Sequence, residues 1–358
     1  MLPFNVIIQA YGGSVFRERI NRRGEPLLVS PATRTDIVVG KTLPYFALAL
    51  GITTVIAVAV GGGPRSILAI APLAALFLGS TFVAALLARS YKELTFVTVA
   101  ISVGLTAYAF VPAVFSNVHP IASISPLTVV VDDLQGAPFA AGPFVLSTVP
   151  VALAAGVVFV LGTAMYREEH LFTRRPLPKK AMDALAEPLD APWRVALWTA
   201  LFVPFVFVAE LFVVAVLFVV PASRSIPIVL GAVAVVEEIA KSVHVYAGFE
   251  RGRFQRTERT AVILGILSGA GFFLAEKLTA ITQLVGLPGL DVGRVAFGPG
   301  FGGASLGVLL LAPLVLHVVT ASISALGAER SRRSYLGALA LAVLVHLGYN
   351  LLVVSILG

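Results

Sequence analysis

Residues 145–165 read VLSTVPVALAAGVVFVLGTAM, a run without a single charged side chain. At ~1.5 Å per residue, a helix of this length crosses a hydrocarbon core of ~30 Å. Comparable apolar runs recur along the whole chain and predict further spans at 40–60, 66–88, 93–116, 195–220, 225–248, 259–283, 303–327 and 335–357. The sequence therefore predicts an all-α fold, a polytopic bundle of about nine transmembrane helices.

The composition supports a membrane protein. Of the 358 residues, 58% are hydrophobic and 13% are charged, and the mean hydropathy is +0.94. A soluble domain of this size needs far more polar surface to cover its core. The chain contains no cysteine, which excludes disulfides, thiolate catalysis and cysteine-based metal sites.

The net charge of +7 has a topological explanation. Most of the 26 basic residues lie in five polar segments, which fall on one side of the membrane if the nine spans alternate. Cytoplasmic loops carry such an excess of Lys and Arg. We therefore expect a multi-pass protein of the cell membrane with cytoplasmic basic loops and an outside C-terminus, and the charge implies no nucleic-acid partner.

A proline-rich, charged stretch at 166–194 predicts a cytoplasmic linker. It separates an N-terminal membrane domain, 1–165, from a C-terminal one, 195–358. Another polar stretch, at 117–144, contains Asp132, Asp133 and several prolines and is predicted to be a solvated outer loop.

Ionisable residues at membrane depth are costly and are either functional or paired. The C-terminal domain concentrates them within its predicted spans: Glu210, Glu237, Glu238, Lys241, Glu276, Lys277, His317 and His346. In VVEEIAKSV, helical spacing places Lys241 beside both glutamates, at i, i+4 and i, i+3. Lys241 can neutralise one of them and leave the other free as a general base. The alternative is a buried ion pair that only fixes helix packing.

The other ionisable residues lie on three further helices. Phe272 and Glu276 share one helix face at i, i+4, and so do His346 and Asn350. Each of these polar groups also has a structural reading, as a local ion pair or an interhelical hydrogen bond. At ~1.5 Å per residue, Glu238, His317 and His346 lie at a similar depth, roughly 15 Å from the cytoplasmic side, and Glu276 lies deeper.

The combined pattern resembles the PrsW family of intramembrane proteases, which is related to the CPBP/Rce1-like proteases. The resemblance covers about residues 195–358. It is carried by E-E-x-x-K, F-x-x-x-E, a histidine, and H-x-x-x-N on four successive helices, here Glu237-Glu238-x-x-Lys241, Phe272-x-x-x-Glu276, His317 and His346-x-x-x-Asn350.

The resemblance implies an endopeptidase that cleaves membrane-protein or peptide substrates within or beside the lipid bilayer. One of Glu237 and Glu238, with Glu238 preferred, would activate water while Lys241 holds the other. Glu276, His317 and His346 would bind a divalent metal such as zinc or position the water, and Asn350 would polarise the scissile carbonyl. A metallo- and a metal-free glutamic mechanism both stay open. Glu210 matches none of the motifs and is assigned to packing or gating.

The N-terminal domain resembles part of an ABC-2 type permease. Residues 18–45, ERINRRGEPLLVSPATRTDIVVGKTLPY, are similar to that family's cytoplasmic coupling loop, and 124–136, ISPLTVVVDDLQG, to its outer loop. This resemblance implies an ABC-type ATPase as a partner. It leaves two alternatives to a protease: a permease subunit or other transporter, and a catalytically inactive membrane scaffold.

Overall fold

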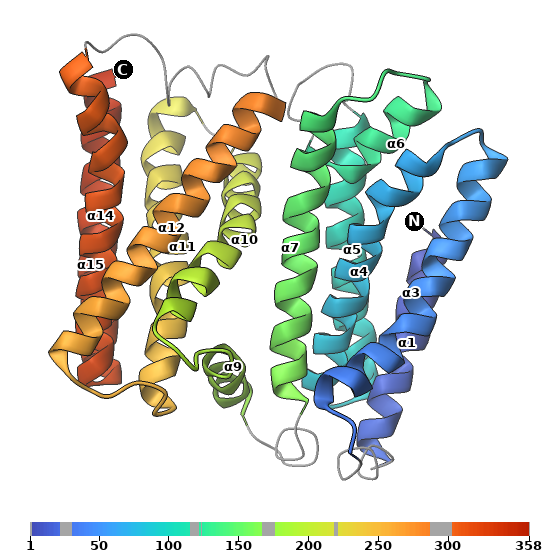
Figure 1. Cartoon of the computed structure of the whole chain (residues 1–358), viewed down its shortest axis with the longest axis horizontal. Coiled ribbons are helices and arrows are strands. Elements are labelled where there is room, and N and C mark those ends of the chain that lie inside the picture. Colours follow the sequence, from blue (N-terminus) through green and yellow to red (C-terminus); the bar gives the residue numbers. More distant parts are fainter. Residues whose placement is uncertain are drawn as a thin grey trace. The chain divides into compact units, whose positions relative to one another are not determined.

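The computed structural model describes residues 2–21, 31–114, 122, 124–166, 176–217, 221–286 and 303–357. Within these ranges every regular element is a helix (Figure 1). The helices are α1 (Leu2–Ile20), α3 (Arg34–Ala59), α4 (Pro64–Leu87), α5 (Tyr91–Val114), α6 (Pro126–Leu134), α7 (Ala141–Met165), α9 (Leu177–Ala186), α10 (Trp193–Leu217), α11 (Ala222–Glu250), α12 (Glu258–Gly286), α14 (Gly303–Arg330) and α15 (Arg332–Leu357).

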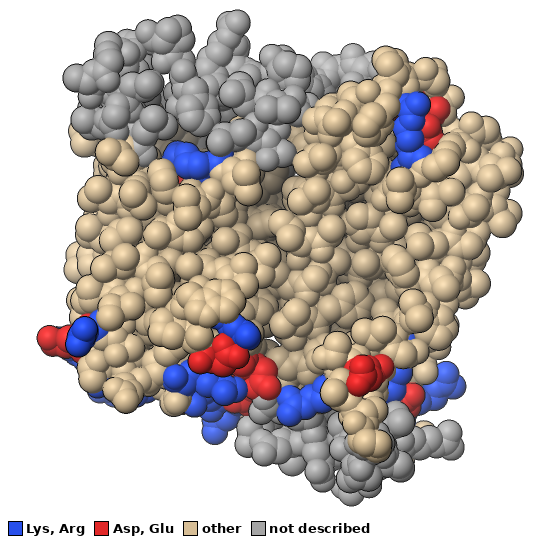
Figure 2. Space-filling view, viewed as in Figure 1, with Lys and Arg blue, Asp and Glu red and all other residues tan. Residues whose placement is uncertain are grey.

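Eight of the described helices are long and apolar enough to cross a membrane, namely α3, α4, α5, α7, α10, α12, α14 and α15. Each coincides with one of the predicted apolar runs to within a few residues at either end, so the all-α polytopic fold is confirmed. The ninth predicted run, 225–248, forms α11, which is 29 residues long but carries Glu237, Glu238 and Lys241 in its centre. On the face shown in Figure 2, charged side chains gather toward the helix ends of each unit and leave the middle uncharged.

The chain divides into two compact units. Unit 1 comprises Met1–Ala181 and Ala280–Val295, and unit 2 comprises Met182–Thr279 and Ala296–Gly358. The predicted linker at 166–194 contains a helix, α9, which the proline-based prediction missed. Residues 167–175 of the linker lie outside the described part of the chain. Residues 22–30, within the predicted permease-like coupling loop at 18–45, also lie outside it.

In unit 1, helix α4 is the most buried span, and side chains from other helices cap both of its ends. At its N-terminus the Asp133 carboxylate of α6 accepts hydrogen bonds from the Gly63 amide at 2.7 Å and the Ser66 hydroxyl at 2.6 Å. At its C-terminus the Arg19 guanidinium of α1 donates to the carbonyls of Ala85, Leu86 and Ala88. Helix ends leave such groups without intrahelical partners, and each charge has the sign that the helix dipole favours.

The interpretation of 117–144 as a solvated loop is wrong for its centre, where residues 126–134 form α6. Ser125 caps this helix by accepting a hydrogen bond from the Leu127 amide, Pro126 occupies its first turn, and Val129 is buried. A serine cap followed by proline is a helix-start signal, and burial of one face stabilises a helix too short to persist alone. Residues 117–121 and 123 lie outside the described part.

Replacing Asp133 by asparagine is expected to destabilise unit 1 by about 1 kcal/mol, the usual value of an N-terminal cap. Hydrogen bonds from the Ser66 hydroxyl and the Gly63 amide lower the pKa of Asp133. The stabilisation by this carboxylate is therefore complete above its unfolded pKa of about 3.9 and is lost as the pH falls through the lower folded value. Thermal unfolding of the detergent-solubilised protein between pH 7 and pH 3 measures this loss, which the variant should lack. Asp132→Asn is the control, because burial raises the pKa of Asp132 instead; an equal effect of both substitutions would contradict the cap.

In unit 2, glycines on α12 allow backbones to meet directly. A Cβ atom added to Gly269 would overlap the backbone of His317 and Val318 on α14, and one added to Gly265 would overlap the backbone of Ser322. Small residues permit such close helix approach in membranes. This contact fixes α12 and α14 side by side, at the position where α14 carries His317.

Replacing Gly269 by alanine is expected to lower the thermal stability of the protein, because His317 can accommodate the new methyl group only by a backbone shift. Overpacking of this kind costs about 1–3 kcal/mol. Gly337→Ala on α15 is the matched control, since no atom lies within 4 Å of the added Cβ there. Thermal unfolding of both variants tests this, and equal midpoints would contradict direct backbone contact.

Candidate active site

Helix α11 brings the two glutamates and the lysine of the E-E-x-x-K motif into the interior of unit 2. Lys241 and Glu238 are fully buried, and the Glu237 side chain is 12% exposed. The Lys241 Nζ lies 2.6 Å from Glu238 Oε1 and 3.9 Å from Glu237 Oε2. Lys241 thus pairs closely with one glutamate, as the sequence predicted, and that glutamate is Glu238.

His346 of α15 links Glu238 to Glu237. Its Nδ1 lies 2.7 Å from Glu238 Oε1, and its Nε2 lies 3.7 Å from Glu237 Oε2. An ionised carboxylate only accepts hydrogen bonds, so His346 Nδ1 carries the proton and Nε2 keeps its lone pair. Glu238 therefore orients the His346 ring with its free nitrogen toward Glu237.

His317 of α14 is held in an equivalent way by Glu276 of α12. Its Nε2 lies 2.9 Å from Glu276 Oε2, while its Nδ1 lies 2.9 Å from Lys241 Nζ and 3.9 Å from Glu237 Oε2. Because an ammonium group has no lone pair, Nδ1 accepts from Lys241 and Nε2 donates to Glu276. The sequence placed Glu276 deeper than His317, yet the two meet because the glycine face of α12 lies directly on α14.

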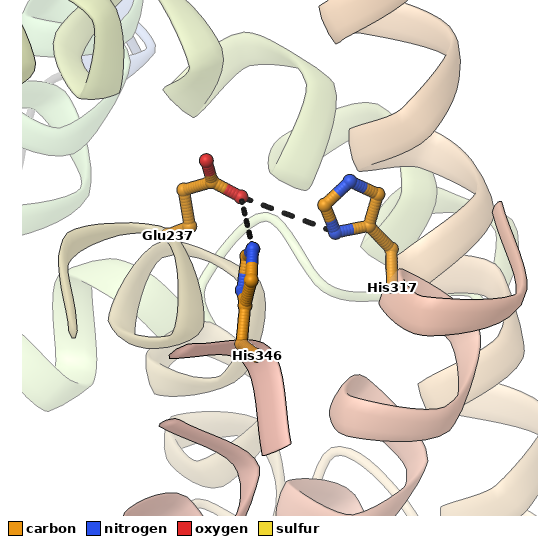
Figure 3. Close-up of side chains that lie close together, drawn as sticks. All are labelled: Glu237, His317 and His346. Atoms are coloured by element: carbon orange, nitrogen blue, oxygen red, sulfur yellow. Dashed lines mark ion pairs between the residues drawn. The ribbon is translucent and has the colours of Figure 1, made fainter. Parts of the chain in front are cut away.

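The free carboxylate oxygen of the site is Glu237 Oε2. Figure 3 shows the Glu237 side chain directed toward the rings of His317 and His346. Among the described residues, Glu237 Oε2 is buried without a hydrogen-bond partner, as is Glu238 Oε2. An unpaired buried polar atom is costly and calls for a ligand or a water.

These three residues fit a divalent metal. One donor atom each from Glu237, His317 and His346 lies within 4.8 Å of the others. A tetrahedral zinc site with bonds of about 2.1 Å has ligand atoms roughly 3.4 Å apart, close to the observed separations of 3.7 Å and 3.9 Å. Two histidines and one glutamate are a ligand set of catalytic zinc sites, and carboxylates that fix the outer histidine nitrogens are typical of such centres.

The remaining predicted residues lie around this group. The Phe272 ring packs 4.9 Å from that of His317, and Lys241 Nζ lies 4.8 Å from the Phe272 centroid. Asn350 is half-buried on α15, one helical turn beyond His346. Glu210 of α10 interacts electrostatically with Glu237 and Glu276, so it belongs beside the site.

The sequence reading missed His244, a fully buried residue of α11. Its Nε2 lies 3.0 Å from Thr199 Oγ1 of α10, which lies 2.9 Å from Ser268 Oγ of α12. The Ser268 hydroxyl donates to the Lys241 carbonyl at 2.6 Å. This chain of polar contacts joins three helices just behind Lys241. The spacing of Glu237, Lys241 and His244, at i, i+4 and i+7 on one helix face, is the signal that would have identified it.

Comparison with known proteins bears on unit 2. No curated protein and no solved structure matches the chain. Residues 187–358, a little under half of the chain, match the family model described as PrsW family intramembrane metalloprotease. The resemblance predicted from the four motifs is thereby confirmed for the C-terminal part, while the ABC-2 resemblance of residues 1–165 stays a prediction. The segment that builds the Glu237, His317 and His346 group is thus similar throughout to the PrsW family intramembrane metalloproteases.

Proposed function

We propose that this protein is an intramembrane endopeptidase that hydrolyses peptide bonds of membrane-associated substrates, with Glu237 as the reactive carboxylate. The observation that carries the proposal is the buried Glu237 Oε2, which has no hydrogen-bond partner among the described residues and lies 3.7 Å from His346 Nε2 and 3.9 Å from His317 Nδ1. Neither a packing role nor a simple ion pair explains why a carboxylate oxygen and one nitrogen of each histidine converge in this way. The family match over residues 187–358 supports the same activity.

Glu237, His317 and His346 are the residues that would hold a metal. A bound divalent ion such as zinc would supply Lewis-acid polarisation and lower the pKa of a coordinated water. In this assignment Glu237 takes the ligand position that the sequence gave to Glu276, and Glu276 instead orients His317. Without a metal, Glu237 is the general base, since Glu238 is occupied by both Lys241 and His346.

The surrounding residues would assist this group. The Asn350 side-chain amide, one turn from His346, would donate to the scissile carbonyl as negative charge develops on its oxygen. Glu210, beside Glu237 and Glu276, would accept or pass on the proton of the attacking water. The apolar bundle excludes bulk water, which strengthens each of these polar interactions.

The test is cleavage of a panel of membrane-anchored reporter peptides by the purified full-length protein, before and after chelation. Cleavage that stops on chelation and returns with added zinc supports the metal mechanism, and cleavage that resists chelation supports the glutamic one. A well-folded wild type that cleaves nothing on a broad panel would favour the scaffold or permease alternative.

For unit 1 we propose the partner that its ABC-2 resemblance implies, an ABC-type ATPase bound at a cytoplasmic face formed by the basic loops. Co-purification of candidate ATPases with the wild type, and its loss when the exposed residues Arg34 and Lys92 are replaced by glutamine, would test the partner. Retained co-purification in that variant would contradict this face as the contact.

A further inference from the structure

The ammonium group of Lys241 lies inside the candidate metal site. Lys241 is fully buried, and its Nζ approaches two of the three candidate ligands, His317 at 2.9 Å and Glu237 at 3.9 Å, while it pairs with Glu238 at 2.6 Å. Burying a lysine this deeply in a membrane bundle is expensive unless its charge is compensated. Here the two adjacent glutamates provide that compensation.

The contact with His317 uses a lone pair that a metal also needs. An imidazole ring has two nitrogens, and the outer one of His317, Nε2, already donates to Glu276. Only Nδ1 retains a lone pair, and Lys241 Nζ donates to it. A single lone pair cannot accept a hydrogen bond from Lys241 and bind a cation at the same time.

We propose that Lys241 and a divalent cation compete for His317 Nδ1, so that the lysine fills the site when metal is absent and withdraws when metal binds. This inference rests on the proposed metal-binding function of Glu237, His317 and His346. Its basis is the 2.9 Å contact of Nζ with Nδ1, together with the 3.9 Å separation of Nζ from Glu237 Oε2.

Electrostatic repulsion acts in the same direction as the competition for the His317 Nδ1 lone pair. An ammonium 3.9 Å from Glu237 neutralises part of the charge that attracts a dication and repels the dication itself. When Lys241 releases His317, it keeps its closer partner, Glu238 Oε1. The charges of Glu237 and Glu238 are thus compensated in both states. Without metal the Lys241 ammonium compensates them, and with metal the ammonium and the cation do so together. Lys241 is in this sense a positioning residue that lowers metal affinity.

The experiment measures metal affinity directly. Co²⁺ is titrated into the purified, metal-stripped full-length protein, with binding followed by its visible absorption and by competition with a chelator. Lys241→Met, which keeps a similar length without charge, is expected to bind Co²⁺ about tenfold more tightly than the wild type, or better, equivalent to ~1.4 kcal/mol or more. Lys277→Met is the matched control, since Lys277 pairs with Glu276 at 3.3 Å and, among the described residues, makes no hydrogen bond or ion pair with Glu237, His317 or His346. The Co²⁺ affinity of this variant should stay near that of the wild type.

Several outcomes decide the question. Unchanged or weaker binding by Lys241→Met overturns the competition and makes Lys241 a support for the ligands; absence of binding by both proteins overturns it as well. If Lys241→Met does not fold, Glu238→Gln/Lys241→Met is compared with Glu238→Gln alone, because both variants then lack the carboxylate that orients His346 and differ only in the lysine. Failure of the protease proposal is separate: tighter binding by the variant with no cleavage by the wild type would sustain the competition and reject the activity.

Discussion

Replacing Glu237 by glutamine is expected to reduce cleavage of a membrane-anchored reporter by about 10²–10⁴-fold, the usual contribution of a general base or its equivalent. Glutamine keeps the size of the side chain but removes the charge of the Glu237 carboxylate and half of its acceptor capacity, at the oxygen that faces both histidines. The rate of reporter cleavage under single-turnover conditions measures the effect.

The metal content of the same variant separates the two mechanisms. If Glu237 is a ligand, Glu237→Gln loses bound zinc along with its activity; if Glu237 is only a base, the activity falls without any change in metal content. Glu258→Gln is the matched control, because Glu258 pairs with Arg330 at an exposed helix end of the same unit, and its rate should equal that of the wild type. Substantial cleavage by folded Glu237→Gln would reject the assignment of the reactive carboxylate.

Replacing His346 by alanine should likewise abolish cleavage and deplete the protein of metal. Two consequences combine: the site loses the Nε2 lone pair, and Glu238 loses the partner held at 2.7 Å by Nδ1. Loss of an outer partner alone typically costs about 10–100-fold in affinity or activity, so Glu238→Gln should lie between His346→Ala and the wild type. Zinc content and reporter cleavage, measured on the three proteins together, give this order.

His244→Gln is the control for a buried histidine outside the group. It lies in the contact chain with Thr199 and Ser268, so its removal should lower the unfolding temperature by breaking a buried hydrogen bond, while zinc binding by the folded protein persists. A loss of zinc equal to that of His346→Ala would mean that the effects come from general disruption of unit 2.

The spans were predictable because their signal is one-dimensional. A helix in lipid must form all its backbone hydrogen bonds internally and present apolar side chains over a fixed length. Runs such as 145–165 and 335–357 can therefore be recognised without knowing which residues they pack against. Helix α6 escaped prediction because its stability depends on burial of residues such as Val129 rather than on length. Helix α9, within the predicted linker, is also too short, at 10 residues, to give a length signal.

The sequence predicts which residues form the candidate site, but it predicts less well what each of them does. Helical spacing places Lys241 within reach of Glu237 and Glu238 alike, and only side-chain orientation shows that Glu238 is the paired one. The preference for Glu238 as the reactive glutamate is replaced by our proposal of Glu237 on that ground. Depth counting along straight helices likewise separated Glu276 from His317, because it cannot include the direct contact of α12 with α14.

The glycines of α12 also determine which parts of unit 2 can move. Backbone meets backbone at Gly265 and Gly269 against α14, and at Gly271 against Ala196 of α10. Close-packed surfaces of this kind have discrete fits and cannot slide gradually. These main-chain contacts hold α12 tightly against α10 and α14, so we expect any opening toward Glu237 to take place where flexible side chains, and not main chains, form the contact.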